Sequence, residues 1–306
     1  MGNSIPESWL TLARRYVRDA PVPFGKEVAA RYLNRQLRDH PRRRVVPTRF
    51  GAAMAVDTQD LIQRYVYLFG VWEPHMTRWL QRRLRPGDTY IDVGANVGYY
   101  SLLASRLVGE TGRVVAIEAS PTLHRRIVQH AELNHRDNIR VVNAAVSDER
   151  KTVSFVLASS HNMGAAGIVP YDGRAELRLD VEAQPLPDVL DREELAAARV
   201  IKIDVEGAEG GVIRGLAPVL DRLRPDAELT VEVTPERMER LGDAAEELLE
   251  TMRAHGFHAY RLANSYAPES YPAARHRSTA VPVRWRGPVS EESDLIFSRV
   301  DAELLP

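Results

Sequence analysis

The stretch Tyr90–Ser101, YIDVGANVGYYS, constrains the fold of this chain more than any other segment. Its apolar run ends at Val93, a turn with Gly94 and Gly98 follows, and the pattern then becomes helical. Glycine admits left-handed backbone conformations and close approach of a ligand, and a helix N-terminus presents free backbone N–H groups. The segment therefore predicts a strand, a tight loop and a helix start that together bind a small molecule.

An acidic residue stands where such a ligand would need it. Glu118 follows the next apolar run, Val114 to Ile117, and a carboxylate at this place can accept hydrogen bonds from both hydroxyls of a ribose. The pattern indicates a nucleoside cofactor. The dinucleotide fingerprint requires G-x-G-x-x-G, whereas this turn reads G-x-N-x-G with Asp92 ahead of it. A NAD-linked dehydrogenase is therefore the weaker enzyme alternative.

Strand-like and helix-like patterns alternate after this turn. The predicted strands are Tyr90–Val93, Val114–Ile117, Ile139–Asn143, Val200–Val205, Leu229–Val233, His258–Leu262 and a last strand at 293–300, with Thr152–Leu157 as a further candidate. The predicted helices are Tyr99–Leu107, Pro121–Asn134, Leu186–Ala197, Gly210–Leu223 and Pro235–His255. This alternation predicts an α/β fold with a doubly wound, mostly parallel, seven-stranded, Rossmann-like sheet and helices on both faces. Ligands bind such sheets beyond the carboxyl ends of the strands.

The flanking segments are less regular. Residues 5–40 have helical spacing, so we expect an N-terminal helical extension at residues 1–45 and the main domain at 46–306. Arginines 42–44 and Arg49 form a basic cluster that is expected in a solvated turn, with a site for a phosphate-bearing partner as the alternative. A short hairpin and two helices are expected to follow. Residues 264–287 contain several prolines and are expected to form an irregular loop near the ligand.

Bulk composition excludes several classes of protein. The net charge of −1 gives no general attraction to nucleic acid, and no cysteine is present to form a disulfide or a thiolate metal site. No apolar run reaches the roughly 18 residues of a membrane helix, and the N-terminus lacks the pattern of a signal peptide. We expect a cytoplasmic protein without membrane or nucleic-acid partners, and leave homo-oligomer formation open.

Several motifs together resemble the FkbM family of S-adenosylmethionine-dependent methyltransferases. They are GVWEP (70–74), LRPGDTYIDVGANVGYYSLLAS (84–105), GETGRVVAIEASP (109–121), AELNHRDNIRVVNAAVSD (131–148), VIKIDVEGAEGGVIRG (200–215), LTVEVTPE (229–236) and SDLIFSR (293–299). The resemblance implies the class I methyltransferase sheet, S-adenosyl-L-methionine as the cofactor, and methyl transfer to hydroxyls in natural-product or sugar assembly.

The resemblance also assigns cofactor-binding residues. Gly94, Asn96 and Gly98 are expected at the methionine end, Asp92 at the ammonium group and Glu118 at the ribose.

Four further positions complete this expected site. Ala119, beside the ribose acid, stands where many members have proline, which should leave ribose binding intact. Ala145 is expected on the adenine, with Asp148 at its border. Glu73 is expected to close over the methionine end, although it can equally be only a helix start before Pro74.

Candidate catalytic residues are Asp204, Lys202, Glu206, Glu232 and His161. Lys202 and Asp204 share one face of an otherwise apolar strand, where charges are costly unless they are paired or bound to a ligand. Glu206 follows in the loop, and Glu232 lies in the apolar strand LTVEV. The alternatives are helix capping, a salt bridge between Lys202 and a glutamate, and structural pairing of Glu232. No metal site is predicted, because two carboxylates alone do not make one.

His161 lies in the turn-rich segment SSHNMGAAG, where it is either a base or an exposed loop histidine.

The sequence thus predicts an S-adenosylmethionine-dependent O-methyltransferase that acts on a hydroxyl of a small molecule. Such a reaction needs an acceptor oxygen placed in line with the methyl–sulfur bond and a group that takes the hydroxyl proton. An N-methyltransferase of a peptide or other biosynthetic intermediate, or a non-catalytic S-adenosylmethionine-binding module, are the alternatives.

Overall fold

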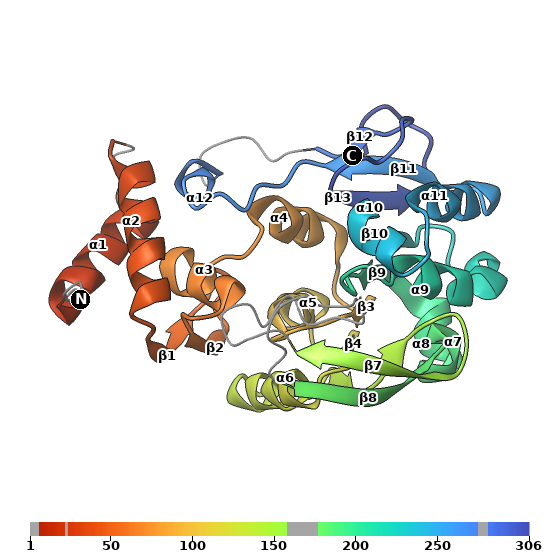
Figure 1. The fold of residues 1–306 in the computed structure, drawn as a ribbon, viewed down its shortest axis with the longest axis horizontal. Coiled ribbons are helices and arrows are strands. Elements are labelled where there is room, and N and C mark those ends of the chain that lie inside the picture. Colours follow the sequence, from red (N-terminus) through yellow and green to blue (C-terminus); the bar gives the residue numbers. More distant parts are fainter. Residues whose placement is uncertain (1–5, 22–23, 158–176, 275–280, 306) are drawn as a thin grey trace.

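The computed structural model of the chain describes residues 6–21, 24–157, 177–274 and 281–305. Its centre is an eight-stranded sheet with the strand order β12-β11-β13-β10-β9-β3-β4-β5 (Figure 1). The strands are β12 (Val283–Arg284), β11 (His258–Leu262), β13 (Ser293–Ser298), β10 (Glu228–Val233), β9 (Ala198–Ile203), β3 (Thr89–Val93), β4 (Arg113–Ile117) and β5 (Ile139–Val142).

Most of this sheet is parallel. Strands β5, β4, β3, β9 and β10 run in one direction, and β13 is inserted antiparallel between β10 and β11. The predicted mostly parallel, doubly wound sheet is therefore confirmed. The predicted count of seven strands is wrong by one, because the two-residue strand β12 pairs with Tyr260 and Arg261 of β11. This strand is too short, and too close to prolines, to leave a period-2 signal in the sequence.

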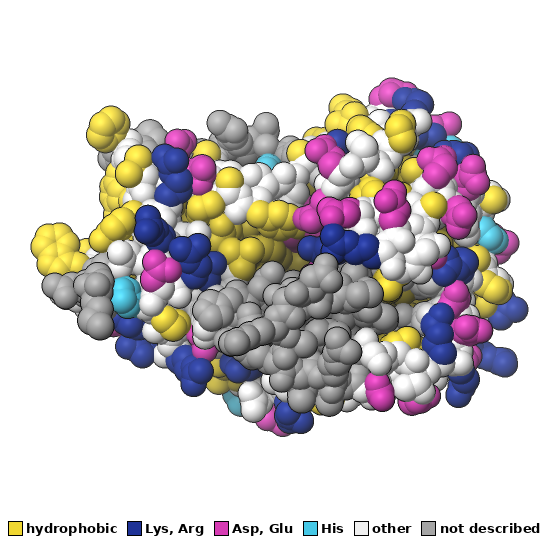
Figure 2. Space-filling model, in the orientation of Figure 1, with side chains coloured by type: hydrophobic (Ala, Val, Ile, Leu, Met, Phe, Trp, Pro, Cys, Tyr) yellow, Lys and Arg dark blue, Asp and Glu magenta, His cyan; other side chains and the backbone are white. Residues whose placement is uncertain are grey.

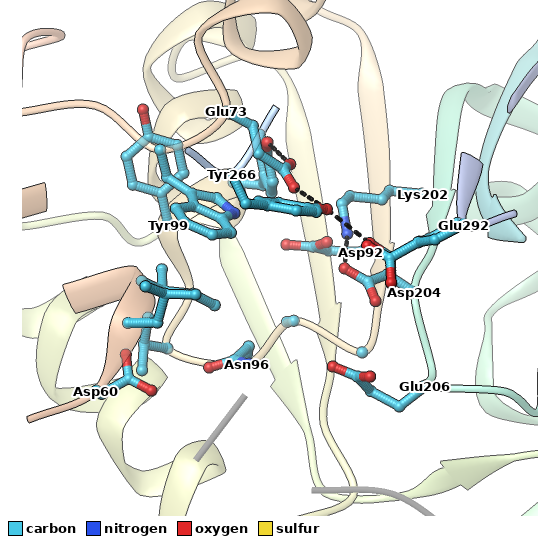
Figure 3. Close-up of a pocket in the computed structure, with 18 of the residues that line it drawn as sticks. Asp60, Glu73, Asp92, Asn96, Tyr99, Lys202, Asp204, Glu206, Tyr266 and Glu292 are labelled. Atoms are coloured by element: carbon cyan, nitrogen blue, oxygen red, sulfur yellow. Dashed lines mark hydrogen bonds and ion pairs between the residues drawn. The ribbon is translucent and has the colours of Figure 1, made fainter. Parts of the chain in front are cut away.

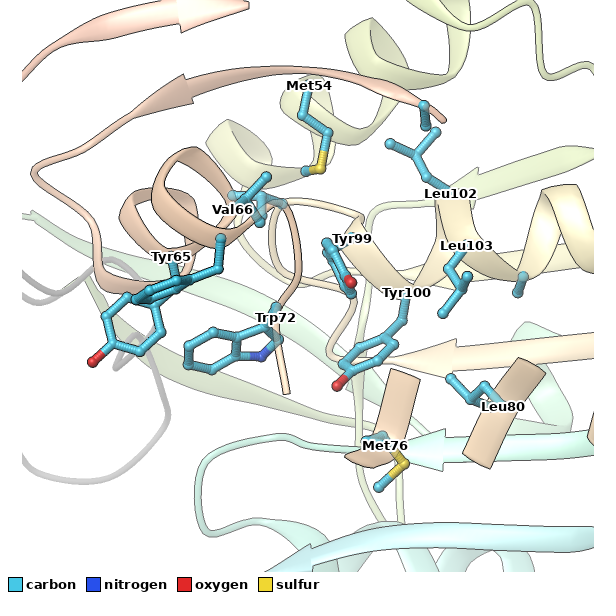
Figure 4. Packing of buried hydrophobic residues seen from close by; sticks show 14 of the residues in the cluster. Met54, Tyr65, Val66, Trp72, Met76, Leu80, Tyr99, Tyr100, Leu102 and Leu103 are labelled. Carbon is cyan, nitrogen blue, oxygen red and sulfur yellow. The ribbon is translucent and has the colours of Figure 1, made fainter. Parts of the chain in front are cut away.

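Helices cover both faces of the sheet. The helices of the described residues are α1 (Glu7–Asp19), α2 (Lys26–Asp39), α3 (Leu61–Phe69), α4 (Pro74–Arg83), α5 (Tyr99–Val108), α6 (Pro121–Leu133), α7 (Leu186–Val189), α8 (Arg192–Ala197), α9 (Glu209–Leu216), α10 (Pro235–Arg240), α11 (Ala245–Ala254) and α12 (Ser270–Ala274), of which α1 and α2 lie beside the sheet (Figure 1). Alternate strand residues supply two cores. Tyr90 and Val114 pack with α3, α4 and α5, whereas Ile91 and Val115 pack with α9 and α11 on the other face. Figure 4 shows the first core around Tyr65, Trp72 and Tyr99.

Three predicted helices differ from the observed ones. The segment 186–197 forms α7 and α8, and 235–255 forms α10 and α11, with Gly242 at a positive φ of 80° between the latter two. The helix predicted at 210–223 ends as α9 at Leu216 and continues as the 3₁₀ helix Ala217–Arg222, because Pro218 cannot donate a backbone hydrogen bond. Helical spacing alone does not reveal such interruptions.

A separate three-stranded sheet has the order β6-β8-β7 and lies outside the main sheet. Its strands are β6 (Ala145–Val146), β8 (Leu177–Gln184) and β7 (Lys151–Leu157). The candidate strand at 152–157 is confirmed as β7, whereas β8 was not expected.

The N-terminal helices α1 and α2 pack on each other and on α3 through side chains such as Leu10, Val17 and Leu33. They lead into a hairpin of β1 (Arg43–Pro47) and β2 (Ala53–Asp57), so β1 spans the boundary expected at residue 45. The expected solvated turn at residues 42–44 is wrong in part, because Arg43 and Arg44 belong to a strand. Among the described residues, no helix combines the length and apolar character needed to cross a bilayer.

Candidate active site

A cavity of about 260 Å³ lies at the carboxyl ends of β3, β9 and β10 (Figure 3). This is the edge at which open α/β sheets bind ligands. The cavity brings together most of the residues that the sequence selected. Those in its wall are Glu73, Asp92, Gly94, Asn96, Lys202, Asp204, Glu206 and Glu232.

The turn after β3 forms the floor of the cavity. Gly94, Asn96 and Gly98 have positive φ values of 81°, 53° and 79°. A Cβ on Gly94 would lie 1.8 Å from the backbone oxygen of Asp204, so this glycine is required for the close packing of the turn on the end of β9. The side-chain Oδ1 of Asn96 is buried and has no hydrogen-bond partner. A buried acceptor without a donor is costly, and a ligand that donates a hydrogen bond would satisfy it.

Glu118 is buried directly behind this turn. Its Oε2 accepts the backbone N–H of Asn96 at 2.8 Å, and its Oε1 accepts the backbone N–H of Ser120 at 2.8 Å. Burial raises the pKa of Glu118 to about 7, although both N–H groups oppose the rise. Each carboxylate oxygen keeps a lone pair, so the group can still accept ribose hydroxyls. It does not itself belong to the wall of the described cavity.

Asp92 is buried at the end of β3. The hydroxyl of Ser101 donates to its Oδ2 at 2.5 Å, and the Tyr90 hydroxyl lies 3.4 Å from its Oδ1. Burial raises the pKa of Asp92, and the ammonium of Lys202 acts in the opposite direction. The carboxylate faces the cavity with part of its hydrogen-bonding capacity in use.

Lys202 and Asp204 form an ion pair, with 2.6 Å between Nζ and Oδ2. The lysine side chain is buried, and its ammonium also lies 5.1 Å from the centre of the Tyr100 ring. Burial lowers the pKa of Lys202, but the carboxylates of Asp204, Asp92 and Glu73 outweigh burial and raise the pKa above its usual value. The Asp204 side chain is 30% exposed and faces the cavity, so an acceptor can reach it. Lys202 therefore does form a salt bridge inside the site, but its partner is Asp204 and not the glutamate that the sequence suggested.

Glu73 and Glu232 share one hydroxyl group. The phenolic oxygen of Tyr266 lies 2.9 Å from Glu73 Oε1 and 2.9 Å from Glu232 Oε1. A phenol donates one hydrogen, so one of the two carboxyl groups must be protonated and donate to it.

The surroundings indicate which carboxyl group holds the proton. Burial raises the pKa of Glu73, but Lys202 and the Tyr100 hydroxyl oppose the rise. Burial and the nearby Asp204, Asp294 and Glu73 raise the pKa of Glu232 well above its usual range. We therefore assign the proton to Glu232. The expectation that Glu73 begins a helix also holds, since it directly precedes α4.

Tyr266 is the residue that sequence reasoning underrated. It lies in the stretch 264–287, for which the sequence predicted only an irregular loop near the ligand. The structure stacks its ring on Trp72, with 5.5 Å between the ring centres, and turns its hydroxyl toward the two acids (Figure 3). The sequence shows an aromatic residue in a predicted loop at this position. No pattern among its neighbours in the sequence predicts a contact with Glu73, which lies 193 residues away.

The loop after β9 is organised by acids. Glu206 has a positive φ of 59° and pairs with Arg237 from α10. Glu209 is fully buried, and its Oε1 accepts the backbone N–H groups of Val205 and Gly207, each at 3.1 Å. Burial raises the pKa of Glu209 to about 7. Glu209 therefore shapes the loop, while Glu206 lines the cavity.

Several predicted residues lie elsewhere. Gly98 begins α5 and faces Ile127, Ala145 lies in β6, and Ala119 packs near Ala145. Asp148 accepts hydrogen bonds from Lys151 at 2.8 Å and from Arg214 at 3.0 Å. Burial raises the pKa of Asp148, but the hydrogen bonds from Lys151, Arg214 and Ser147 together outweigh burial and hold the pKa below its usual value. None of these four residues lines the described cavity, and their cofactor roles stay predictions.

His161, the remaining catalytic candidate, lies outside the described residues. Over the part of the chain that the structure describes, no group of three or more His, Asp or Glu side chains has the arrangement of a metal site.

Comparison with known proteins points to one family. The model of the methyltransferase FkbM domain matches residues 92–259. The 31-O-demethyl-FK506 methyltransferase FkbM of Streptomyces tacrolimicus is 29% identical over 202 residues, which cover 57% of this chain and 74% of that protein.

More distant similarities extend to other methyltransferases. Protein-L-isoaspartate O-methyltransferase 2 of Archaeoglobus fulgidus is 30% identical over 115 residues, covering 37% of this chain and 51% of that protein. The chain thus spans about half the length of this relative. A crystal structure of methyltransferase FkbM from Methylobacillus flagellatus aligns with a TM-score of 0.40 at 15% identity, covering 78% of this chain and 52% of that one.

Proposed function

Since the chain belongs to the FkbM methyltransferase domain family, we propose that this methyltransferase uses S-adenosyl-L-methionine to methylate a hydroxyl group of a small organic molecule. The family match supports methyl transfer. The cofactor, the oxygen acceptor and the small-molecule class are the proposal.

The residues around the β3 turn suit S-adenosylmethionine. Asn96 presents a buried oxygen without a donor, and Asp92 presents a buried carboxylate, so both suit the ammonium of the methionine end. Glu118 retains free lone pairs for the ribose hydroxyls. When bound, the cofactor would supply a methyl group on a positively charged sulfur, which needs no further activation.

The Asp204–Lys202 ion pair is the observation that supports a hydroxyl oxygen as the methyl acceptor. A hydroxyl becomes a competent nucleophile when its proton has a base to move to. Asp204 faces the cavity beside the turn, and Lys202 holds its carboxylate in place from the buried side. Asp204 would take the hydroxyl proton as the oxygen attacks.

The charge of the cavity disfavours a carboxylate acceptor. Its wall holds two cations, Lys202 and Arg237, which are paired with Asp204 and Glu206. It also holds further acids that include Asp92 and Glu292, so the excess of acids would repel an entering carboxylate. A neutral hydroxyl suffers no such repulsion and can donate to these acids. This separates the proposal from the activity named for the isoaspartate relatives.

The substitution Asp204→Asn tests the proposal. It removes the base but keeps the shape of the side chain, so we expect turnover to fall about 100-fold or more while the affinity for S-adenosylhomocysteine changes little. Turnover is measured as transfer of labelled methyl from S-adenosylmethionine to a panel of hydroxylated and amine-bearing small molecules, and affinity by calorimetry.

Asp243→Asn is the matched control, since Asp243 pairs with Arg214 outside the cavity. Transfer to amines but to no hydroxyl would favour the N-methyltransferase alternative. Binding of S-adenosylhomocysteine without any transfer would favour the non-catalytic module, and a complete lack of binding would refute the proposed cofactor site.

A further inference from the structure

The N-terminal helix pair carries an unusual concentration of exposed apolar side chains. Trp9 and Leu12 lie one turn apart on α1, Val28 and Tyr32 lie one turn apart on α2, and Phe24 lies in the connection between the helices. Phe24 is 86% exposed, Trp9 67% and Tyr32 55%. We call these five side chains the N-terminal apolar surface. Figure 2 shows hydrophobic side chains projecting at the left end of the molecule, over α1 and α2.

This surface is not the ordinary scatter of exposed apolar residues. Among the described residues, the large aromatic side chains that are exposed are Trp9, Phe24 and Tyr32, and all three belong to this surface. Single exposed apolar residues are common, but exposed aromatic groups gathered on one small unit usually mark a contact surface. The unit lies outside the matched family domain, so the contact is not required by the shared fold.

The same segment is strongly basic. Residues 1–45 contain ten lysine and arginine side chains but four aspartate and glutamate side chains, a net charge of +6, whereas the whole chain has a net charge of −1. Arg35 and Arg43 have side chains that are 76% and 84% exposed, and Arg31 is exposed on α2 as well. A partner of this surface must therefore match both apolar groups and positive charge.

A second copy of the chain fits this charge poorly. A symmetric dimer places the same patch of both subunits face to face, which would bring two segments of +6 together. An anionic lipid bilayer fits, because its surface attracts arginine and lysine while its acyl boundary accepts tryptophan, phenylalanine and leucine. The helix pair also stands at one end of the molecule, beside rather than over the sheet (Figure 1), and so can meet a flat surface.

We propose that the N-terminal apolar surface and the arginines around it bind the chain peripherally to a membrane that contains anionic phospholipids. This departs from the sequence expectation of no membrane partner, which rested on the lack of an apolar span. A helix pair that lies on a bilayer needs no such span. The proposal is independent of the proposed acceptor.

Vesicle sedimentation of the full-length protein tests this inference. We expect the protein to sediment with vesicles of phosphatidylglycerol and phosphatidylcholine in equal parts, and far less with vesicles of phosphatidylcholine alone. The variant Trp9→Gln/Phe24→Gln/Tyr32→Gln should bind at least about tenfold more weakly, because it loses the groups that enter the acyl boundary. Circular dichroism checks that the variant remains folded.

The chain offers a matched control for the apolar contribution. The triple variant Leu133→Gln/Val300→Gln/Leu304→Gln removes exposed apolar side chains elsewhere on the surface and should bind like the wild type. The variant Arg31→Gln/Arg35→Gln should weaken binding to the anionic vesicles, by about fivefold for each charge that lies near the lipid. Salt at high concentration should act in the same direction.

Three outcomes would overturn the inference. They are equal binding to both kinds of vesicle or to neither, equal binding by wild type and the aromatic triple variant, and a wild-type dimer in light scattering that the aromatic triple variant converts to a monomer. The last result would show that a second copy covers this surface instead.

Discussion

Within the cavity, three acids have different surroundings and therefore different chemistry. Asp204 is paired with a lysine and partly exposed, Glu73 accepts two phenolic hydroxyls, and Glu232 faces other acids across the end of the sheet. Environments that separate the protonation of neighbouring carboxyl groups are typical of acid–base sites. Tyr266 is the group that links two of the three acids.

The substitution Tyr266→Phe tests whether the hydroxyl between Glu73 and Glu232 contributes to the reaction. It removes the hydroxyl that Glu73 and Glu232 share, and leaving buried polar groups without partners costs about 1–3 kcal/mol. We expect kcat to fall on the order of tenfold, with little change in affinity for S-adenosylhomocysteine, because the Tyr266 hydroxyl bonds to Glu73 and Glu232 and not to the β3 turn. Steady-state kinetics and calorimetry measure the two effects.

Tyr67→Phe is the control for loss of a buried phenol, since Tyr67 is buried in α3 and does not line the cavity. If Tyr266→Phe and Tyr67→Phe had the same effect on kcat, the bridge between the acids would have no role in the reaction.

Glu118 should make cofactor affinity depend on pH. Its pKa is raised to about 7 by burial, and its ionised form is the better acceptor for ribose hydroxyls. Below pH 7 a growing fraction of the protein holds the neutral acid, so the apparent affinity for S-adenosylhomocysteine should be about tenfold weaker at pH 6 than at pH 8. Calorimetry at a series of pH values measures this slope.

In Glu118→Gln the affinity for S-adenosylhomocysteine should no longer change between pH 6 and 8, and it should be weak over this whole range. A slope that persists in this variant would assign the titration to another group, such as Asp92, whose pKa is also raised by burial.

Among the elements, the turn between β3 and α5 depends most on its contact with β9. The backbone of Gly94 lies against the backbone oxygen of Asp204, and the N–H of Asp204 donates to the oxygen of Val93 at 3.0 Å. The turn after β3 and the end of β9 that carries Asp204 are thus packed backbone to backbone. Any change that separates them moves Asp204 relative to the turn.

Gly94→Ala should therefore be severely destabilising. A Cβ would meet the Asp204 oxygen at 1.8 Å at a φ of +81°, so the loss in the free energy of unfolding should exceed about 4 kcal/mol. Gly256→Ala places a side chain at a similar positive φ of +76° but has nothing within 4 Å of the new Cβ, and should cost about 1–2 kcal/mol. Denaturant unfolding compares the two, and equal losses would contradict the contact.

For the molecule as a whole, the last strand holds the C-terminal half of the sheet together. Strand β13 pairs with β10 on one side and β11 on the other, and all six of its residues are buried. Residues close to the end of the chain therefore complete a sheet whose other strands precede them. Strands β10 and β11 do not pair with each other, and each pairs with β13. Without β13, β11 would lose its connection to β10 and the rest of the sheet.

Phe297→Ala should measure this dependence. Phe297 is 1% exposed between Leu229 and Ala259, and truncation of a buried phenylalanine costs about 3–5 kcal/mol. Val283→Ala in the edge strand β12, at 51% exposure, should cost about 0.5 kcal/mol or less. A similar loss of unfolding free energy for both variants would argue against a central position of β13.

Most of the strands and helices, and the acids at the strand ends, can be read from the amino-acid sequence. The strands at 90–93, 114–117 and 229–233, the glycine turn and the placement of Glu118 and Asp204 all follow from local periodicity and turn chemistry, which act over a few neighbouring residues. The family motifs then indicated what such a turn binds.

The contacts between side chains far apart in the chain became known from the folded structure. Tyr266 and Glu73 are 193 residues apart, and β13 lies between strands that both precede it in the chain. Such contacts depend on how elements pack in space, and no local pattern encodes the packing partner of a side chain. For the same reason the exposed aromatic groups of α1 and α2, which by spacing alone suit a buried helix face, could be recognised as a surface only after folding.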